Sequence, residues 1–186
     1  VTGIFSATSV DPVLGNIALR IAVENIENEG DIAGLMGRVV ASPAERTLAV
    51  LVGRLARFAA MDIEAARAVA PARAIVWARL AESLMATGER ALVDPVGVLL
   101  HALFDHGDLA DAALLPVFGR AARALLEFAW ATSPPLALAS DRAIRFVGKS
   151  FASDPVASRA LLDRILRKPH FSQYADREAT RLAEQI

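Results

Sequence analysis

The feature that most constrains the fold of this chain is a set of recurring helix-start signals. Asp-Pro-Val occurs at positions 11–13, 94–96 and 154–156, and Ser-Pro occurs at 42–43 and 133–134. An Asp or Ser side chain ahead of a helix can accept a hydrogen bond from an unpaired backbone N–H, and proline suits the first helical position because it has no N–H to satisfy. The three Asp-Pro-Val units are 83 and 60 residues apart, so any repeat is degenerate rather than strictly periodic. The pattern predicts short helices that start repeatedly along the chain.

Apolar residues between these signals recur at helical spacing. Three predicted buried faces are Leu48, Leu51, Val52, Leu55 and Phe58; Trp77, Leu80, Ala81, Leu84 and Met85, ahead of Gly88; and Phe118, Ala121, Ala122, Leu125, Phe128 and Ala129. No long segment alternates with the period of two that is typical of a strand. The chain has 186 residues, of which 54% are hydrophobic. It fits a single all-α domain, 1–186, of about 8–10 helices, and it could be a fragment of a longer chain.

Helix boundaries follow from the same signals. The expected start residues are a capping side chain or a proline, and they are Asp11, Asp31, Ser42, Asp62, Asp94 and Pro116. Pro71 should break or kink the helix that begins at Asp62. The last three helices should span about 136–152, 154–168 and 173–186.

Two helix starts late in the chain resemble the second helix of a HEAT-type repeat. In such a helix an Asp comes first, an Arg follows, and small and aliphatic residues face the core. The matching residues are Asp141, Arg145 and Val147, and then Asp176, Arg177, Ala179, Leu182, Ala183 and Ile186. Segments 154–168 and 172–186 together resemble a helical hairpin of that class. The resemblance covers the last third of the chain and implies a HEAT-like α-solenoid, a scaffold with a curved helical surface. An irregular multi-helix bundle is the alternative, because helix-start chemistry alone produces the same pattern.

The segment HALFDHGDLAD, residues 101–111, holds two of the three histidines and three aspartates. On a helix, His101 and Asp105 share a face because they are four residues apart, and His106 follows about 100° around the axis. A zinc site requires three or four converging ligands. The residues of a metal-site hypothesis here are His101, Asp105, His106 and Asp108.

We favour a structural interpretation of this segment. Gly107 should end one helix in the left-handed conformation, and His106 in the last turn complements the helix dipole. Asp108 should then cap the next helix. The segment therefore predicts a helix end followed by a helix start rather than a continuous helix.

No pattern of residues indicates catalysis or a cofactor. Gly148-Lys149-Ser150 resembles the end of a phosphate-binding loop, but Ala143 stands where that motif has its first glycine, and no strand is predicted before it. The absence of cysteine excludes thiolate chemistry in this sequence. No nucleophile elbow or metalloprotease helix occurs. We expect a protein that is not an enzyme and that uses no cofactor.

Charge is unevenly distributed along the chain. Residues 1–35 carry five acidic residues and a single basic one, Arg20, whereas residues 142–186 carry nine basic and five acidic residues. The basic end supplies the predicted interaction surface, which consists of Arg159, Arg164, Arg167, Lys168, Arg177 and Arg181. A net charge of −1 and carboxylates among these arginines disfavour a nucleic-acid partner. We expect a protein partner, or self-association through the oppositely charged ends.

The apolar content leaves a second function open. A pocket for an apolar ligand could be lined by Trp77, Met85, Phe104, Phe118, Phe128 and Trp130, although aromatic residues at helical spacing usually form the core. Charged residues interrupt every long apolar run, so we expect no membrane span. The sequence thus predicts a soluble, cytoplasmic, non-catalytic scaffold for protein interactions. A helical apolar-ligand domain is the main alternative, followed by a phosphate-backbone-binding repeat and a His/Asp metal-dependent enzyme.

Overall fold

The computed structural model describes residues 45–131 and 154–166. It also describes the single residues Ile26, Gly30, Asp31, Arg145, Phe146, Gly148, Lys149, Arg177, Thr180, Arg181 and Glu184. Within these residues every regular element is helical, which confirms the all-α class. The helices are α4 (Glu45–Ala66), α5 (Pro71–Ala86), α6 (Val93–His106), α7 (Leu114–Ala131) and α9 (Pro155–Leu166), with a short 3-10 helix at Arg90–Leu92. The predicted starts at Asp11 and Ser42 lie outside the described residues.

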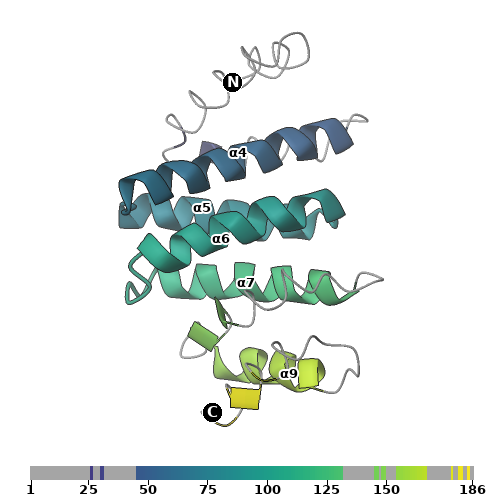
Figure 1. Ribbon diagram of the computed structural model, residues 1–186. Coiled ribbons are helices and arrows are strands. Elements are labelled where there is room, and N and C mark those ends of the chain that lie inside the picture. Colours follow the sequence, from purple (N-terminus) through teal and green to yellow (C-terminus); the bar gives the residue numbers. More distant parts are fainter. Residues whose placement is uncertain are drawn as a thin grey trace.

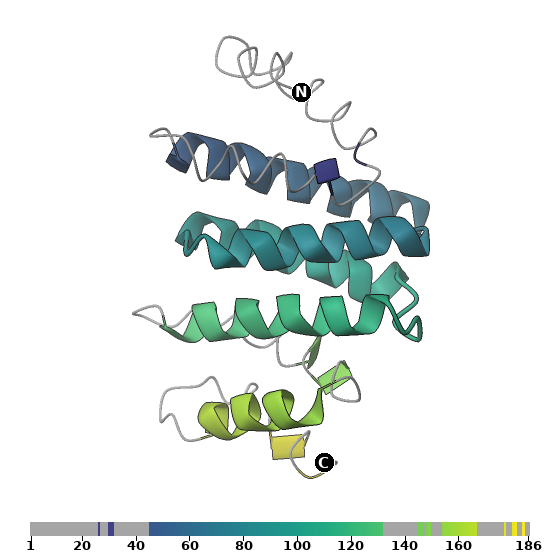
Figure 2. The same cartoon turned by 180° about the vertical axis from the view of Figure 1, so that it is seen from behind.

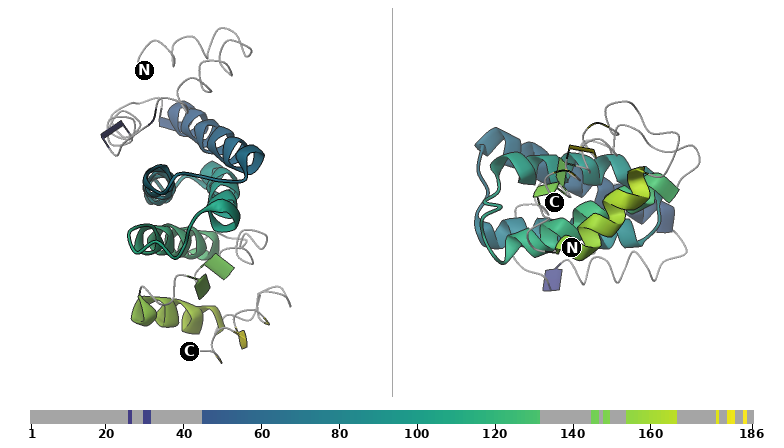
Figure 3. Two further views of the ribbon diagram at one scale, coloured as in Figure 1. Left: turned by 90° about the vertical axis from the view of Figure 1, so that its left-hand side faces the viewer. Right: turned by 90° about the horizontal axis from the view of Figure 1, so that it is seen from below.

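The described helices form two layers. Helices α4 and α6 lie in one layer, and α5, α7 and α9 lie in the other (Figure 3). The most extensive packing joins helices two apart in the chain, α4 with α6 and α5 with α7, and α9 packs against α7. Because the chain reverses direction between successive helices, neighbours within a layer run parallel (Figure 1). The helices therefore form a stack with α4 at one end and α9 at the other.

The core lies between and within these layers. The largest fully buried side chains are Trp77, Phe118, Phe146, Leu80, Leu84, Leu92, Leu99, Leu100, Leu103, Leu114 and Leu125. Phe146 contacts Phe104 and Phe118, with ring centroids 5.3 and 5.6 Å away, so a residue of the 145–149 region is anchored to α6 and α7. Burying each large aliphatic side chain contributes about 1.5–3 kcal/mol. The helices therefore bury apolar faces against one another, as the helical spacing of apolar residues in the sequence predicts.

Two of the predicted faces are confirmed where they are described. On α5 all five predicted residues, from Trp77 to Met85, are buried. On α7 the residues Phe118, Ala121, Ala122 and Leu125 are fully buried. Gly88 follows α5 with a φ of 71°, a left-handed conformation that suits glycine, and its N–H donates to the carbonyl oxygen of Met85 at 3.2 Å. The helix end expected at Gly88 is therefore confirmed.

The helix start predicted at Asp62 is wrong. Helix α4 continues through Asp62 to Ala66, because Ile63 still lies on the buried face that includes Ala59. The chain turns at Arg67, whose φ is 51°, and the break predicted at Pro71 is confirmed because α5 begins there. Packing of the apolar face thus outweighs a capping-type side chain in the middle of a helix.

The predicted starts of α6, α7 and α9 are correct to within two residues. The start expected at Asp31 is not confirmed, because Gly30 before it is helical as well. Helix α7 begins at Leu114, which puts Pro116 in its first turn. Helix α6 begins at Val93, and its N-terminus has no side-chain cap. At α9 the side chain of Asp154 does cap the helix, since its Oδ1 accepts a hydrogen bond from the N–H of Ala157 at 3.1 Å. The same Asp-Pro-Val tripeptide therefore begins two helices in different ways.

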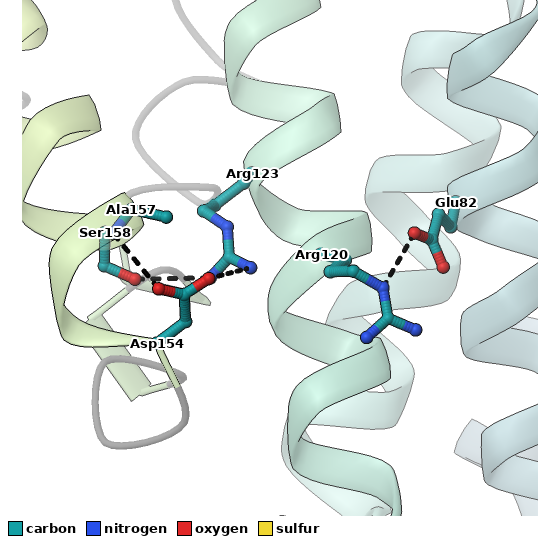
Figure 4. A network of polar contacts seen from close by, with 6 residues as sticks. All are labelled: Glu82, Arg120, Arg123, Asp154, Ala157 and Ser158. Atoms are coloured by element: carbon teal, nitrogen blue, oxygen red, sulfur yellow. Dashed lines mark hydrogen bonds and ion pairs between the residues drawn. The ribbon is translucent and has the colours of Figure 1, made fainter.

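Polar contacts join α7 to its two neighbours in the layer (Figure 4). Arg120 donates to Glu82 of α5 at 2.9 Å, and Arg123 donates to Asp154 at 3.2 Å and to Ser158 of α9 at 3.3 Å. Only 13% of the Arg123 side chain is exposed, against 45% for Arg120. The contact to α9 is therefore the better shielded of the two.

We predict that Arg123→Ala lowers the free energy of unfolding by about 1–2 kcal/mol, because it removes charged hydrogen bonds that are partly shielded from water and leaves Ser158 buried with a partner fewer. Arg120→Ala, a change on the same helix, should cost about 0.2–1 kcal/mol because its ion pair is exposed. Urea denaturation followed by circular dichroism measures both. Equal losses in the two variants would show that Arg123 does not hold α9.

Candidate functional site

The segment 101–111 is not a continuous helix, as predicted: α6 ends within it, and α7 begins three residues after it, at Leu114. Helix α6 ends at His106, and the N–H of Gly107 donates to the carbonyl oxygen of Leu103 at 2.8 Å. Gly107 has φ −84° and ψ 149°, so the left-handed conformation expected for it is wrong. A Cβ at this position would lie 2.4 Å from the Leu103 oxygen. Glycine is required here by close approach of the backbone and not by a positive φ.

The expectation that Asp108 caps α7 is also wrong. Asp108 Oδ1 accepts a hydrogen bond from the N–H of Ala110 at 3.0 Å, which closes a local turn. Asp111 caps the helix instead, because its Oδ1 accepts from Ala113 at 2.7 Å and from Leu114 at 3.2 Å. Both aspartates have a capping side chain, and the sequence alone did not show which of them lies at the helix boundary.

The two histidines have separate carboxylate partners. His101 Nδ1 lies 3.5 Å from Asp105 Oδ2, one turn along α6. His106 Nε2 lies 3.0 Å from Glu64 Oε2 on α4. Sequence reasoning missed Glu64, because it is 42 residues from His106 and only the stacking of α4 on α6 brings the two together. Among the residues that the structure describes, no three His, Asp or Glu side chains are grouped so that they could hold a metal ion.

The predicted basic surface is described in part. Arg159 on α9 is exposed, and so are Arg177 and Arg181, which are helical. Arg164 lies in α9, but its side chain is outside the described residues, as are Arg167 and Lys168. Arg159 belongs to α9, which lies at the end of the described stack opposite α4 (Figure 2).

The predicted apolar pocket corresponds only partly to a cavity in the structure. A partly open cavity of about 230 Å³ lies at the turn between α4 and α5 and is lined by Ala59, Asp62, Ile63, Ala66, Ala68, Val69, Ala70, Arg73 and Trp77. Of the predicted residues whose side chains the structure describes, only Trp77 lines it, and the side chain of Trp130 lies outside the described part of the chain. Phe104 and Phe118 pack against Phe146 instead, and Met85 is buried in the core. Ligand pockets are usually about 300–1,000 Å³, so this cavity is small for an organic ligand.

Gly148 and Lys149 are both helical, as expected for a segment that is not a phosphate-binding loop. No helix among the described residues is long and apolar enough to cross a membrane.

Comparison with known proteins gave no match. Neither a model of a known protein family, nor a curated protein, nor a solved structure matched the chain.

Two glycines of α6 and the turn after it give a matched test of the backbone geometry. Gly107→Ala should lower the melting temperature, because its Cβ would clash with the Leu103 oxygen. Gly97→Ala should raise it by an amount corresponding to about 0.5–1 kcal/mol, because Gly97 is helical, has open space around its Cβ position and gains helix propensity. Differential scanning calorimetry checks both. A Gly107→Ala variant as stable as the parent would contradict the turn geometry.

Proposed function

We propose that this chain is a non-catalytic, HEAT-like helical-repeat scaffold that binds other proteins. The observation that carries the proposal is the parallel stacking of helices two apart in the chain. In a solenoid each two-helix unit packs on the next, so equivalent helices align within a layer. In a closed bundle, by contrast, all helices surround one core.

The spacing of the inter-helix polar contacts fits a repeat of this kind. Arg57 pairs with Asp94 at a separation of 37 residues, and Glu82 pairs with Arg120 at a separation of 38. Glu64 and His106 are 42 residues apart. HEAT-type repeats are about 40–47 residues long. The Glu64–His106 separation falls in that range, two others fall just below it, and Arg123 and Asp154 are only 31 residues apart, so the spacing supports two-helix units of variable length.

A repeated sequence accompanies the repeated contact. Gly-Arg-X-Ala-Arg occurs at 53–57 in α4 and at 119–123 in α7. In both, the last arginine pairs with the Asp of an Asp-Pro-Val unit at the start of the next helix in its layer: Arg57 with Asp94 at α6, and Arg123 with Asp154 at α9. Gly-Arg-X-Ala-Arg on one helix and Asp-Pro-Val on the next helix in the same layer thus form an approximate repeat, in which an Arg–Asp ion pair joins the two helices.

The surface supports protein binding better than catalysis. Exposed side chains of both signs cover the outer faces of the described helices, and the cavity at the α4–α5 turn is small. Asp163 and Arg159 are both exposed on α9 and lie four residues apart in the sequence. A mixed surface of this kind fits a protein partner and would repel much of a phosphate backbone.

Hydrogen exchange measured by mass spectrometry tests the repeat fold. Leu161 of α9 is fully buried, and Leu161→Ala should cost about 2–5 kcal/mol locally. In a stacked repeat, protection should fall in α9 and less in α7, while α4 at the far end keeps its protection, because each unit contacts only its neighbours. Leu80→Ala in the middle of the stack is the control and should affect both sides. Equal loss of protection in α4 and α9 with either variant would contradict the proposal.

Affinity capture with the full chain tests the binding role. Arg159→Glu/Arg177→Glu reverses two exposed arginines of the basic surface, and Arg54→Glu/Arg90→Glu makes the same change on exposed arginines elsewhere. A specific partner should be lost only with the first pair. Capture that is the same for both pairs would argue against this surface.

A further inference from the structure

The turn between α4 and α5 lacks the polar residues that usually form turns. Residues 65–72 read Ala-Ala-Arg-Ala-Val-Ala-Pro-Ala, so Arg67 is their one polar side chain. Ala70 is the N-cap of α5 and makes no side-chain cap hydrogen bond, although Asp, Asn, Ser and Thr are preferred there. The next two connections differ: the hydroxyl of Thr87 donates to a carbonyl oxygen in the last turn of α5 at 2.7 Å, and Asp111 caps α7. Local stability therefore does not explain the apolar composition of the α4–α5 turn.

The backbone of the same turn is strained. Arg67 has a φ of 51°, in the left-handed region that is unfavourable for a residue with a Cβ. The turn after α5 has a glycine, Gly88, at its own positive φ of 71°, where no such strain arises. Strained backbone persists only where the surrounding structure holds it, and it gathers at binding sites. The strain at Arg67 and the missing cap at Ala70 both point to a binding role for this turn.

The turn borders the cavity between α4 and α5, which has the size of one side chain. The lining includes the buried Ile63 and Trp77 and, where the cavity opens to solvent, exposed alanines such as Ala66 and Ala70. Apolar cavities of about 150 Å³ are large enough to bind benzene. At about 230 Å³, this cavity has room for one aromatic or branched aliphatic group.

Charges of both signs also line the cavity. Asp62 of α4 and Arg73 of α5 are each partly buried there. An occupant with a single charge, such as a fatty acid or an amine, is repelled by one of the two. A neutral apolar side chain on a peptide meets no such repulsion, and polar groups beside it on the peptide can complement both charges. The lining thus favours a protein segment over a free charged ligand.

We propose that the cavity at the α4–α5 turn receives one aromatic or branched aliphatic side chain of a partner protein. The proposal rests on the protein-binding role proposed above and names a contact for it. Much of the affinity of a protein interface comes from a few such side chains that are buried in pockets, surrounded by contacts that exclude water. The exposed alanines of the turn can supply these surrounding contacts at little cost in side-chain entropy.

Titration of the full chain with blocked amino acids, followed by NMR, tests the proposal without the partner. N-acetylphenylalaninamide and N-acetylleucinamide should saturably shift the methyl signals of Ile63 and the indole N–H signal of Trp77, because both residues line the cavity. Ile75 lies on α5 outside the lining and is the internal reference, so its signals should stay in place. N-acetylglycinamide, which lacks a side chain, should shift none of these signals.

Two substitutions distinguish loss of the site from loss of the fold. Ala66→Phe puts a ring at the cavity and should weaken binding of the blocked amino acids by about tenfold or more. Ala65→Phe changes the neighbouring exposed residue, which does not line the cavity, and should bind them like the wild type. Ala70→Asp should raise the melting temperature, because it supplies the missing N-cap, and should still weaken binding, because it puts a carboxylate at an apolar site.

Three outcomes would overturn the proposal. One is the absence of saturable shifts with both blocked amino acids, and another is equal affinity in Ala66→Phe and Ala65→Phe. The third is a shift of the Ile63 and Trp77 signals with toluene alone, since the cavity would then admit free small molecules but no side chain attached to a peptide. The titration uses no partner and no residue of the basic surface, so its failure leaves the affinity-capture result for the proposed function unchanged.

Discussion

Packing between helices two apart in the chain is the contact on which the described structure depends. Among the fully buried residues of the helices that make it are Ala56 and Ala60 on α4 and Ala121 and Ala122 on α7. Small side chains let helix axes approach closely, and Gly53 shows how tight the fit is, since a Cβ there would lie 3.0 Å from the side chain of Leu92. Small buried residues on α4 and α7 therefore favour close packing of these helices against their neighbours.

Ion pairs at the edges of these contacts set the alignment of the stacked helices more than they stabilise it. Arg57 and Asp94 are both largely exposed, and such a pair contributes about 0–1 kcal/mol. The contact of Arg123 is better shielded from water and includes the buried Ser158, so its loss should lower the free energy of unfolding by more. Opposite charges at fixed positions favour one register of a helix on its neighbour over slipped alternatives. Such specificity matters in a chain whose helices have similar apolar faces.

The helical class and much of the core were predictable from sequence, because both follow from local periodicity. The buried face from Trp77 to Met85, the break at Pro71 and the helix end at Gly88 are confirmed. Local signals failed at two places. Asp62 lies inside a helix because the buried face of α4 continues past it, and Asp111 rather than Asp108 caps α7 although both offer the same side chain. The pairing of His106 with Glu64 could not be predicted, since it depends on which helices stack. The metal-site and interaction-surface hypotheses have the same limit, because both depend on which side chains the tertiary fold brings together.

The central claim is that α4 and α9 lie at opposite ends of an open stack, and a distance between them tests it most directly. The chain has no cysteine, so Met61→Cys and Val156→Cys, both at exposed positions, introduce the only two thiols for spin labels. Pulsed electron paramagnetic resonance should give one narrow distance that is clearly longer than the distance from the same α4 label to a label at Asp105→Cys on the adjacent helix α6. An α4–α9 distance equal to or shorter than the α4–α6 distance would mean that the helices close around one core, and would contradict the account.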